Sequence, residues 1–228
     1  MNFYKDTAPK MISDFIADDE TQLNKLEMLV TNKITFPSPS KKAIILHGRF
    51  GTGKTELAKL LPNLIEAHRV EGFEENACDN YFSQQISTFL SCKANEYAKT
   101  IKNAMPTTVS FNKSRKHYVI LDEVDNLPAH FQKSMKSFIT EHDNVIYIMT
   151  TNHITSVDAG LKSRSHLISF ESPSKDLWLK RCKEICEMYG ATYDERYLKN
   201  LIAISRCDAR NILTELEARI VLEKDKAA

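Results

Sequence analysis

Long hydrophobic runs are missing from this 228-residue chain, and turn-forming residues are scarce. The longest apolar stretches, near Ala43–Leu46 and Tyr118–Leu121, have the length of strands and fall far short of the roughly 20 residues that cross a bilayer. The first residues contain no apolar signal-peptide core, so we expect no membrane span and predict a cytoplasmic location. Only six glycines and seven prolines exclude a fibrous or low-complexity protein.

Paired cysteines and an excess of one charge are also missing. The five cysteines include no C-x-x-C pair, which favours free thiols over a zinc site. The charges of the 31 basic and 30 acidic residues nearly cancel, so the chain lacks the net positive charge that is usual for an avid DNA binder. A local basic stripe can still follow phosphates. Lys113–Lys116 and Lys133 with Lys136 are candidates, and each also fits an ordinary solvated face.

The most informative segment present is a phosphate-binding pattern. It is the run Gly48-Arg49-Phe50-Gly51-Thr52-Gly53-Lys54-Thr55, which fits G-x-x-x-x-G-K-[ST] without a mismatch. The glycines allow successive backbone N–H groups to point at a phosphate. Lys54 supplies a charge for the β- and γ-phosphates, and Thr55 supplies a hydroxyl for Mg²⁺. A strand before the run and a helix after it complete the required context, so the sequence predicts a nucleoside triphosphate site.

A second segment supplies the groups needed for hydrolysis. The apolar strand Tyr118–Leu121 ends in Asp122 and Glu123. Asp122 lies where a carboxylate can hold Mg²⁺, and Glu123 lies where a carboxylate can polarise a water molecule for attack on the γ-phosphate.

Three further polar residues are candidates for the same site. Asn152 follows the strand 145–150 and has an amide that can fix the attacking water, although strand ends are often rich in asparagine. Arg164 lies between a predicted helix and a strand, and Arg210 lies in the first turn of a helix. An arginine fork suits the spread charge of a phosphoryl group, whereas surface salt bridging is the alternative for both.

The order of predicted elements indicates an α/β fold. Strands are expected over 43–46, 70–74, 117–121, 145–150 and 167–170. Helices are expected within 12–30 and over 54–66, 81–101, 128–141 and 158–163. This alternation predicts a parallel five-stranded sheet flanked by helices. After a linker at 171–174, three helical patterns follow over 175–189, 194–205 and 208–223. We therefore predict a P-loop domain over 1–171 and a small helical lid over 172–228.

Together these residues resemble the AAA+ ATPases. Within that family they are similar to the small ATPase subunits of sliding-clamp loaders, of the replication factor C small-subunit and phage clamp-loader type. The resemblance rests on a series of short matches in the family's order. Pro9–Ile16 resembles the opening motif that lies against the adenine, and Asn76–Asp79 resembles Asn-Ala-Ser-Asp. Leu121–Asp125, followed by Gln132, resembles Walker B, and Thr150–Asn152 resembles sensor 1. Leu161–Ser165 resembles Ser-Arg-Cys, and Cys207–Arg210 resembles the Gly-Asp-x-Arg of sensor 2.

The resemblance implies a role for each matched side chain. It implies that Asn152 holds the lytic water, that Arg164 acts in trans on the ATP of a neighbouring subunit, and that Arg210 reaches the γ-phosphate from the lid. Ser165 stands where the family has cysteine, and Cys207 stands where it has glycine. The match ends with the lid, without the collar domain of clamp-loader subunits.

The predicted function is an ATP-hydrolysing, Mg²⁺-dependent subunit of an oligomer that acts in DNA replication. Its expected partners are other AAA+ subunits, DNA, and a sliding clamp or a replicative helicase, in the host cytoplasm if a phage encodes the chain. Two alternatives remain open. One is a helicase loader or transposition ATPase built on the same module, and the other is an ATP-binding scaffold that does not turn over.

Overall fold

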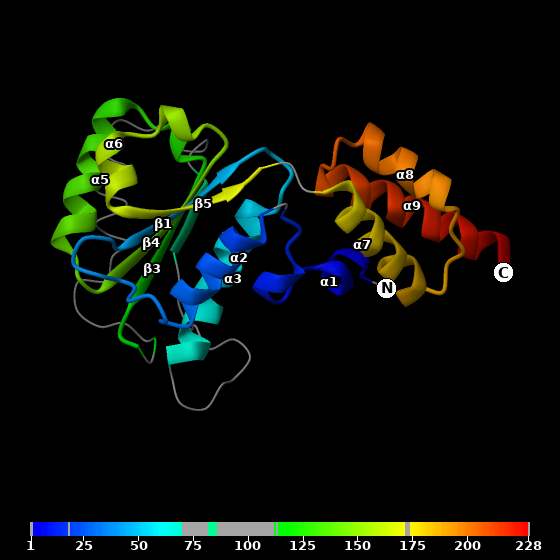
Figure 1. Ribbon diagram of the computed structural model, residues 1–228, viewed down its shortest axis with the longest axis horizontal. Helices are drawn as coiled ribbons and strands as arrows, with labels where there is room; N and C mark the ends of the chain where they lie inside the picture. Colours follow the sequence, from blue (N-terminus) through cyan, green and yellow to red (C-terminus); the bar gives the residue numbers. More distant parts are fainter. Residues whose placement is uncertain are drawn as a thin grey trace.

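A computed structural model describes residues 2–17, 19–69, 82–85, 112, 114–171 and 174–227. It contains a sheet covered by helices and a second group of helices. The two parts meet beside the N-terminal segment (Figure 1). None of the helices in these ranges combines the length and apolarity needed to cross a bilayer.

The sheet is parallel, with strand order β2-β3-β4-β1-β5. Its strands are β1 (Ala43–Gly48), β2 (Phe82–Gln85), β3 (His117–Asp122), β4 (Val145–Thr151) and β5 (Ser165–Phe170). The predicted class, a P-loop α/β fold with a parallel sheet flanked by helices, is confirmed. Because all strands run the same way, the residues that follow β1, β3 and β4 meet at one edge of the sheet.

The helix predicted over 81–101 is wrong in the part of it that the structure describes. Residues 82–85 fall inside the helix predicted over 81–101, yet they form β2, which pairs with β3 in the register Phe82↔Val119. The edge of β3 offers unpaired backbone groups, and pairing with them overrides a weak local preference. The rest of that helix, the strand predicted over 70–74 and the motif at 76–79 lie outside the described residues.

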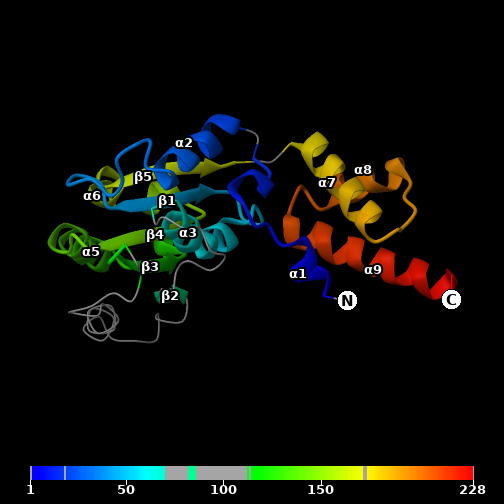
Figure 2. The same ribbon diagram turned by 90° about the horizontal axis from the view of Figure 1, so that it is seen from below.

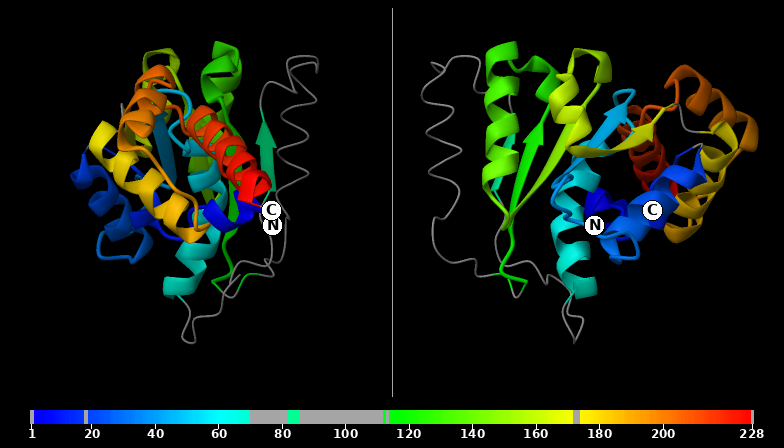
Figure 3. Two further views of the ribbon diagram at one scale, coloured as in Figure 1. Left: turned by 90° about the vertical axis from the view of Figure 1, so that its right-hand side faces the viewer. Right: turned by 60° about the vertical axis from the view of Figure 1, so that its left-hand side comes forward.

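Alternating side chains give the sheet two buried faces. Ile44 and Leu46 belong to the cluster under α2 (Glu20–Val30) and α3 (Lys54–Arg69). Ala43 and Ile45 belong to the opposite cluster, under α5 (Ala129–Glu141) and α6 (Ala159–Ser163). Figure 3 shows the two helical layers on either side of the strands. Burial on both faces explains why these strands read as continuous apolar runs.

Three helices form the lid, and they are α7 (Lys175–Met188), α8 (Glu195–Ile204) and α9 (Ala209–Ala227). Their shared core contains the free thiols of Cys182, Cys186 and Cys207. Burial raises the pKa of Cys182 to about 12, so this thiol stays protonated and unreactive in the folded lid.

A short helix that the sequence did not predict, α1 (Phe3–Thr7), packs against the lid rather than against the sheet (Figures 1 and 2). Phe3 is part of the lid core and stacks on Tyr189, with ring centroids 5.4 Å apart. The Tyr189 hydroxyl donates to Asp6 over 2.9 Å. Ile12, soon after α1, is buried in the core between the sheet and helices α2 and α3. The N-terminal segment therefore connects the two parts a second time, and the domain boundary at 171 remains a prediction.

Candidate active site

A cavity of about 900 Å³ opens between the sheet edge, the N-terminal segment and the lid. Its wall brings together most of the residues that the sequence singled out. They are Phe50, Gly51, Thr52, Gly53, Lys54, Thr55, Asp122, Glu123, Asn152 and Arg210. The carboxyl edge of a parallel sheet is where α/β proteins bind ligands, so the position of this cavity agrees with a nucleotide site.

The phosphate-loop candidate follows β1 and is held from the lid side. Gly51 has φ +74°, and a Cβ atom there would overlap the carboxylate of Asp208. The Gly51 carbonyl accepts a hydrogen bond of 2.8 Å from the backbone N–H of Ala209, at the start of α9. A glycine is needed at this position for both the backbone angle and the close approach of the lid. The loop and the lid are therefore in direct contact.

Lys54 is folded back onto the loop that precedes it. Its ammonium group donates to the carbonyls of Gly48 and Arg49, over 2.9 and 2.5 Å, and only 6 % of the residue is exposed. Burial removes water from the charge and lowers the Lys54 pKa to about 8, although the carboxylates of Asp122 and Asp125 partly oppose this shift. Such a buried cation is suited to receive an anion of high charge.

The Asp122 carboxylate accepts hydrogen bonds from hydroxyl groups of α3 and β4. The Thr55 hydroxyl donates to its two carboxylate oxygens over 3.0 and 3.2 Å. The Thr150 hydroxyl donates to Oδ1 as well, and it accepts a bond of 3.0 Å from the backbone N–H of Glu123. One hydroxyl from β4 therefore fixes both acidic residues at the end of β3.

No local sequence pattern points to a role for Thr150, and its contact with Asp122 follows from the register of two strands. β3 and β4 are paired as Leu121↔Met149, so Asp122 and Thr150 are the next residues of two adjacent strands. A hydroxyl at that position lies beside the carboxylate. Without knowing which strands are neighbours, the sequence cannot reveal this contact.

We expect Thr150→Val to lower kcat roughly 5- to 100-fold in an ATPase assay, because the change leaves Asp122 and the Glu123 N–H each short of a partner. Thr151→Val is the matched control, since its buried hydroxyl accepts from the His153 N–H instead. Equal losses in the two variants would contradict a specific role for Thr150.

Glu123 occupies an unusual backbone conformation at the cavity wall. Its φ and ψ are 61° and 50°, in the left-handed region that residues with a side chain seldom adopt. Its carboxylate accepts a bond of 3.2 Å from the side-chain amide of Asn126. Strained residues of this kind gather at functional sites, where the surrounding structure holds them in place. Asn152, after β4, lines the same cavity.

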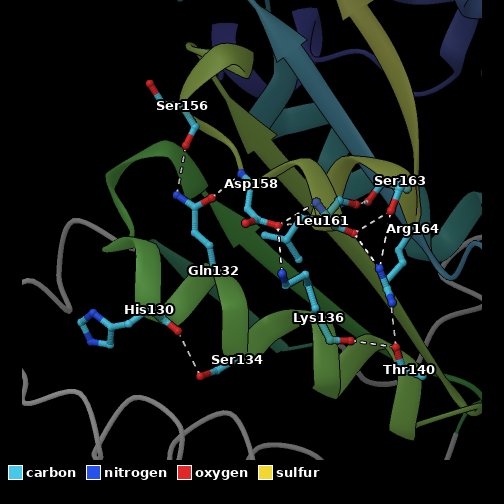
Figure 4. Close-up of polar contacts among 12 residues, drawn as sticks. His130, Gln132, Ser134, Lys136, Thr140, Ser156, Asp158, Leu161, Ser163 and Arg164 are labelled. Carbon is cyan, nitrogen blue, oxygen red and sulfur yellow. Dashed lines mark hydrogen bonds and ion pairs between the residues drawn. The ribbon is translucent and has the colours of Figure 1, made fainter.

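Arg164 does not reach this cavity. It ends α6, and its guanidinium donates to the Thr140 hydroxyl over 3.2 Å and to the Gly160 carbonyl over 3.1 Å (Figure 4). Arg164 therefore lies on the outer helical layer formed by α5 and α6.

Gln132 connects that outer layer with the loops at the sheet edge. Its amide nitrogen donates to the Leu127 carbonyl over 3.0 Å. The same nitrogen donates to the Ser156 carbonyl over 3.2 Å, and the amide oxygen accepts from the Asp158 N–H over 2.6 Å (Figure 4). Asp158 in turn caps the start of α6, the helix after which Arg164 follows as the C-cap residue. The loops after β3 and β4 and the base of α6 are thus joined by one buried side chain.

Sequence comparison places the chain among known ATPases. Residues 44–172, more than half of the chain, match the ATPase family associated with various cellular activities (AAA). The replication factor C small subunit of Aeropyrum pernix is 26 % identical over 219 residues, which cover 95 % of this chain and 62 % of that protein. The replication factor C large subunit of Halorubrum lacusprofundi is 26 % identical over 180 residues, or 78 % of this chain and 35 % of that protein.

Structure comparison gives the same fold. The Thermotoga maritima RuvB Holliday junction branch migration motor superposes with a TM-score of 0.69 and 14 % identity, over 95 % of this chain and 65 % of that one. This chain therefore spans less than two thirds of the length of each of these three proteins. The predicted resemblance to replication factor C subunits is confirmed. Because the family match extends from β1 to the end of the sheet, the chain belongs to the AAA family of ATPases.

Proposed function

We propose that this chain is a Mg²⁺-dependent ATPase subunit that acts in DNA replication, within an oligomer of clamp-loader type. The observation that carries the proposal is the cavity in which Lys54, Thr55, Asp122 and Glu123 come together. The placement in replication is supported by the relative from Aeropyrum pernix, whose alignment covers 95 % of this chain.

The residues of the cavity fit ATP and Mg²⁺. Lys54 is a buried cation that donates to neutral oxygens of its own loop, so a triphosphate would add a counter-charge in direct contact with it. Thr55 and Asp122 already lie in contact and offer the oxygen ligands that Mg²⁺ prefers. When bound there, the metal ion would neutralise charge on the phosphate oxygens.

The remaining side chains take the roles of a hydrolytic site. Glu123 accepts a proton from the attacking water, and Asn152 positions that water. Arg210 approaches from the lid and stabilises charge on the γ-phosphate. Arg164 lies outside the cavity of its own subunit, which is expected if it serves the site of a neighbour. The proposed chemistry therefore requires an oligomer.

The low pKa of Lys54 predicts a pH dependence of ATP binding. Below about pH 8 the free protein carries the ammonium needed for the phosphates, and above that pH binding must include uptake of a proton. We expect the Kd for ATP to be nearly constant from pH 7 to 8 and to rise towards tenfold per unit above it, as measured by calorimetry. Lys54→Arg, which does not titrate in this range, should remove the rise. A flat wild-type profile would contradict the assignment.

DNA is the proposed polymer partner. Of the basic residues singled out in the sequence, Lys133 on α5 and Arg115 are exposed. Lys136 pairs with Asp158 over 3.4 Å, and Lys116 donates to the Asp143 carbonyl over 3.0 Å. Lys113 lies outside the described residues. Lys133 and Arg115 therefore make the better candidates for phosphate contacts.

The deciding experiment is an ATPase assay with and without primer–template DNA. Strong stimulation by primed DNA is the expected result, with blunt duplex of equal length as the control. Hydrolysis without stimulation would remove the clamp-loader proposal in favour of a helicase loader or another remodelling ATPase. Binding without hydrolysis would indicate a scaffold subunit. Co-purification with a sliding clamp or with a replicative helicase then distinguishes the two protein partners.

A further inference from the structure

Arg164 lies between the short helix α6 and the strand β5. The helix contains only five residues, Arg164 is its C-cap, and β5 begins at the next residue, Ser165. A helix of this length gains little stability from its own backbone bonds. The place from which the arginine side chain leaves the main chain is therefore set by the contacts of the residues around it.

The side chain of Ser165 holds this junction to the helix. Ser165 is 0 % exposed, and its hydroxyl donates to the Leu161 carbonyl over 2.8 Å. The acceptor lies four residues back, so the hydroxyl takes the place that a backbone N–H would occupy if the helix continued. The same carbonyl accepts a bond of 3.1 Å from the Arg164 N–H. Two bonds to one carbonyl oxygen therefore fix the backbone on either side of the Arg164 Cα atom.

Both ends of this hydroxyl bond are anchored in the fold. The Ser165 carbonyl accepts a bond of 2.8 Å from the Lys41 ammonium group, and the residue pairs with β1 in the register Ala43↔Ser165. Leu161, at the other end, is buried in the core under α5 and α6. Because packed groups lie on both sides, the backbone of Arg164 has a fixed position, while its guanidinium can change partners.

We propose that Ser165 is a positioning residue, whose hydroxyl bond to the Leu161 carbonyl sets the place from which Arg164 reaches the ATP site of a neighbouring subunit. This inference rests on the proposed function, in which Arg164 acts in trans. Ser165 does not line the cavity of its own subunit, so it acts on the reaction through Arg164. Loss of the hydroxyl therefore impairs the neighbouring site and leaves the variant's own cavity intact.

Single substitutions give the first test. Ser165→Ala should bind ATP with the wild-type Kd and hydrolyse it about 3- to 30-fold more slowly, because one buried hydrogen bond is lost. Ser165→Cys keeps a weak donor and should recover part of the rate. Ser134→Ala is the matched control, since that hydroxyl also donates four residues back, to the His130 carbonyl over 3.1 Å, but on the exposed side of α5 (Figure 4). Equal rates in Ser165→Ala and Ser134→Ala overturn the inference.

Mixed oligomers separate the positioning of Arg164 from a general effect on the fold. In a mixture of Arg164→Ala and Glu123→Gln subunits, the first kind supplies the complete cavity and the second kind supplies the arginine. Adding Ser165→Ala to the Glu123→Gln subunit should lower turnover about 3- to 30-fold. Adding it to the Arg164→Ala subunit should leave turnover unchanged, because that subunit has no arginine to position. Equal losses in the two mixtures, or no loss in either, overturn the inference.

Failure of this inference is distinguishable from failure of the proposed function. If the wild type does not hydrolyse ATP, the ATPase proposal falls and this inference falls with it. If the wild type is active but the two parent variants do not complement each other in a confirmed mixed oligomer, the trans arginine is wrong. If they complement and Ser165→Ala has the same effect on either subunit, the trans arginine stands and only the role of Ser165 is removed.

Discussion

Glu123→Gln should bind ATP with nearly the wild-type Kd and hydrolyse it roughly 10²- to 10⁴-fold more slowly, the usual contribution of a general base. Glutamine keeps the size of the side chain and its oxygen can still accept the 3.2 Å bond from Asn126, but an amide does not take a proton from water. The Lys54, Thr55 and Asp122 contacts that would hold the phosphates and metal are untouched. Single-turnover hydrolysis and equilibrium ATP binding, measured on the same preparation, separate the two effects.

A control of the same chemical kind is Glu141→Gln, at the exposed end of α5 and outside the cavity wall. It should hydrolyse ATP at the wild-type rate. Turnover of Glu123→Gln within a few fold of wild type would remove the assignment of Glu123 as the base. Loss of ATP binding in that variant would instead show that Glu123 supports the structure of the site.

The sheet and its edge could be predicted because their signals are local. Ile44 and Ile120 belong to two short apolar runs; the glycine-rich loop follows the first run, and the Asp122–Glu123 pair follows the second. In a parallel sheet, such ends meet at one edge whatever the strand order. The sequence therefore predicted that these side chains share a site before the order of the strands was known.

Contacts between elements distant in sequence were not predictable in this way. The bond from Thr150 to Asp122 depends on β3 and β4 being neighbours, and the docking of Phe3 in the lid core joins the two ends of the chain. Strand β2 depends on the free edge of β3 rather than on its own residues. Each of these features is decided by tertiary pairing, which a pattern read along one segment does not contain.

The docking of α1 has a consequence for motion. Residues between Thr7 and Ile12 join a helix in the lid core to a residue in the sheet core, and Ala8 and Pro9 line the cavity. Arg181 of α7 donates to the Thr7 carbonyl over 3.2 Å, so the end of α1 is bonded to the lid. A change in lid angle would have to be taken up by the segment between Thr7 and Ile12, part of which lines the cavity, so we expect ligand binding in the cavity to be coupled to the position of the lid.

Arg164→Ala should retain ATP binding and lose hydrolysis by roughly 10³-fold or more, if its guanidinium stabilises the phosphoryl group of a neighbouring subunit. In the single chain the guanidinium is held by the Thr140 hydroxyl and the Gly160 carbonyl, away from the cavity. Both acceptors are neutral oxygens near the surface, where water can replace them, so the guanidinium can leave them at small cost. Thr140→Val removes one of them while keeping the arginine, and it should hydrolyse ATP at close to the wild-type rate.

Mixing two inactive variants distinguishes action in trans from action within one chain. Arg164→Ala subunits keep an intact Glu123, and Glu123→Gln subunits keep an intact Arg164. In a mixed oligomer, each interface where a Glu123→Gln subunit presents its arginine to an Arg164→Ala subunit contains a complete site. Turnover should therefore rise well above that of either variant alone and peak near equal amounts. A mixture no more active than the sum of its parts, in a confirmed mixed oligomer, would contradict a trans arginine, because a site assembled within one chain gains nothing from its neighbour.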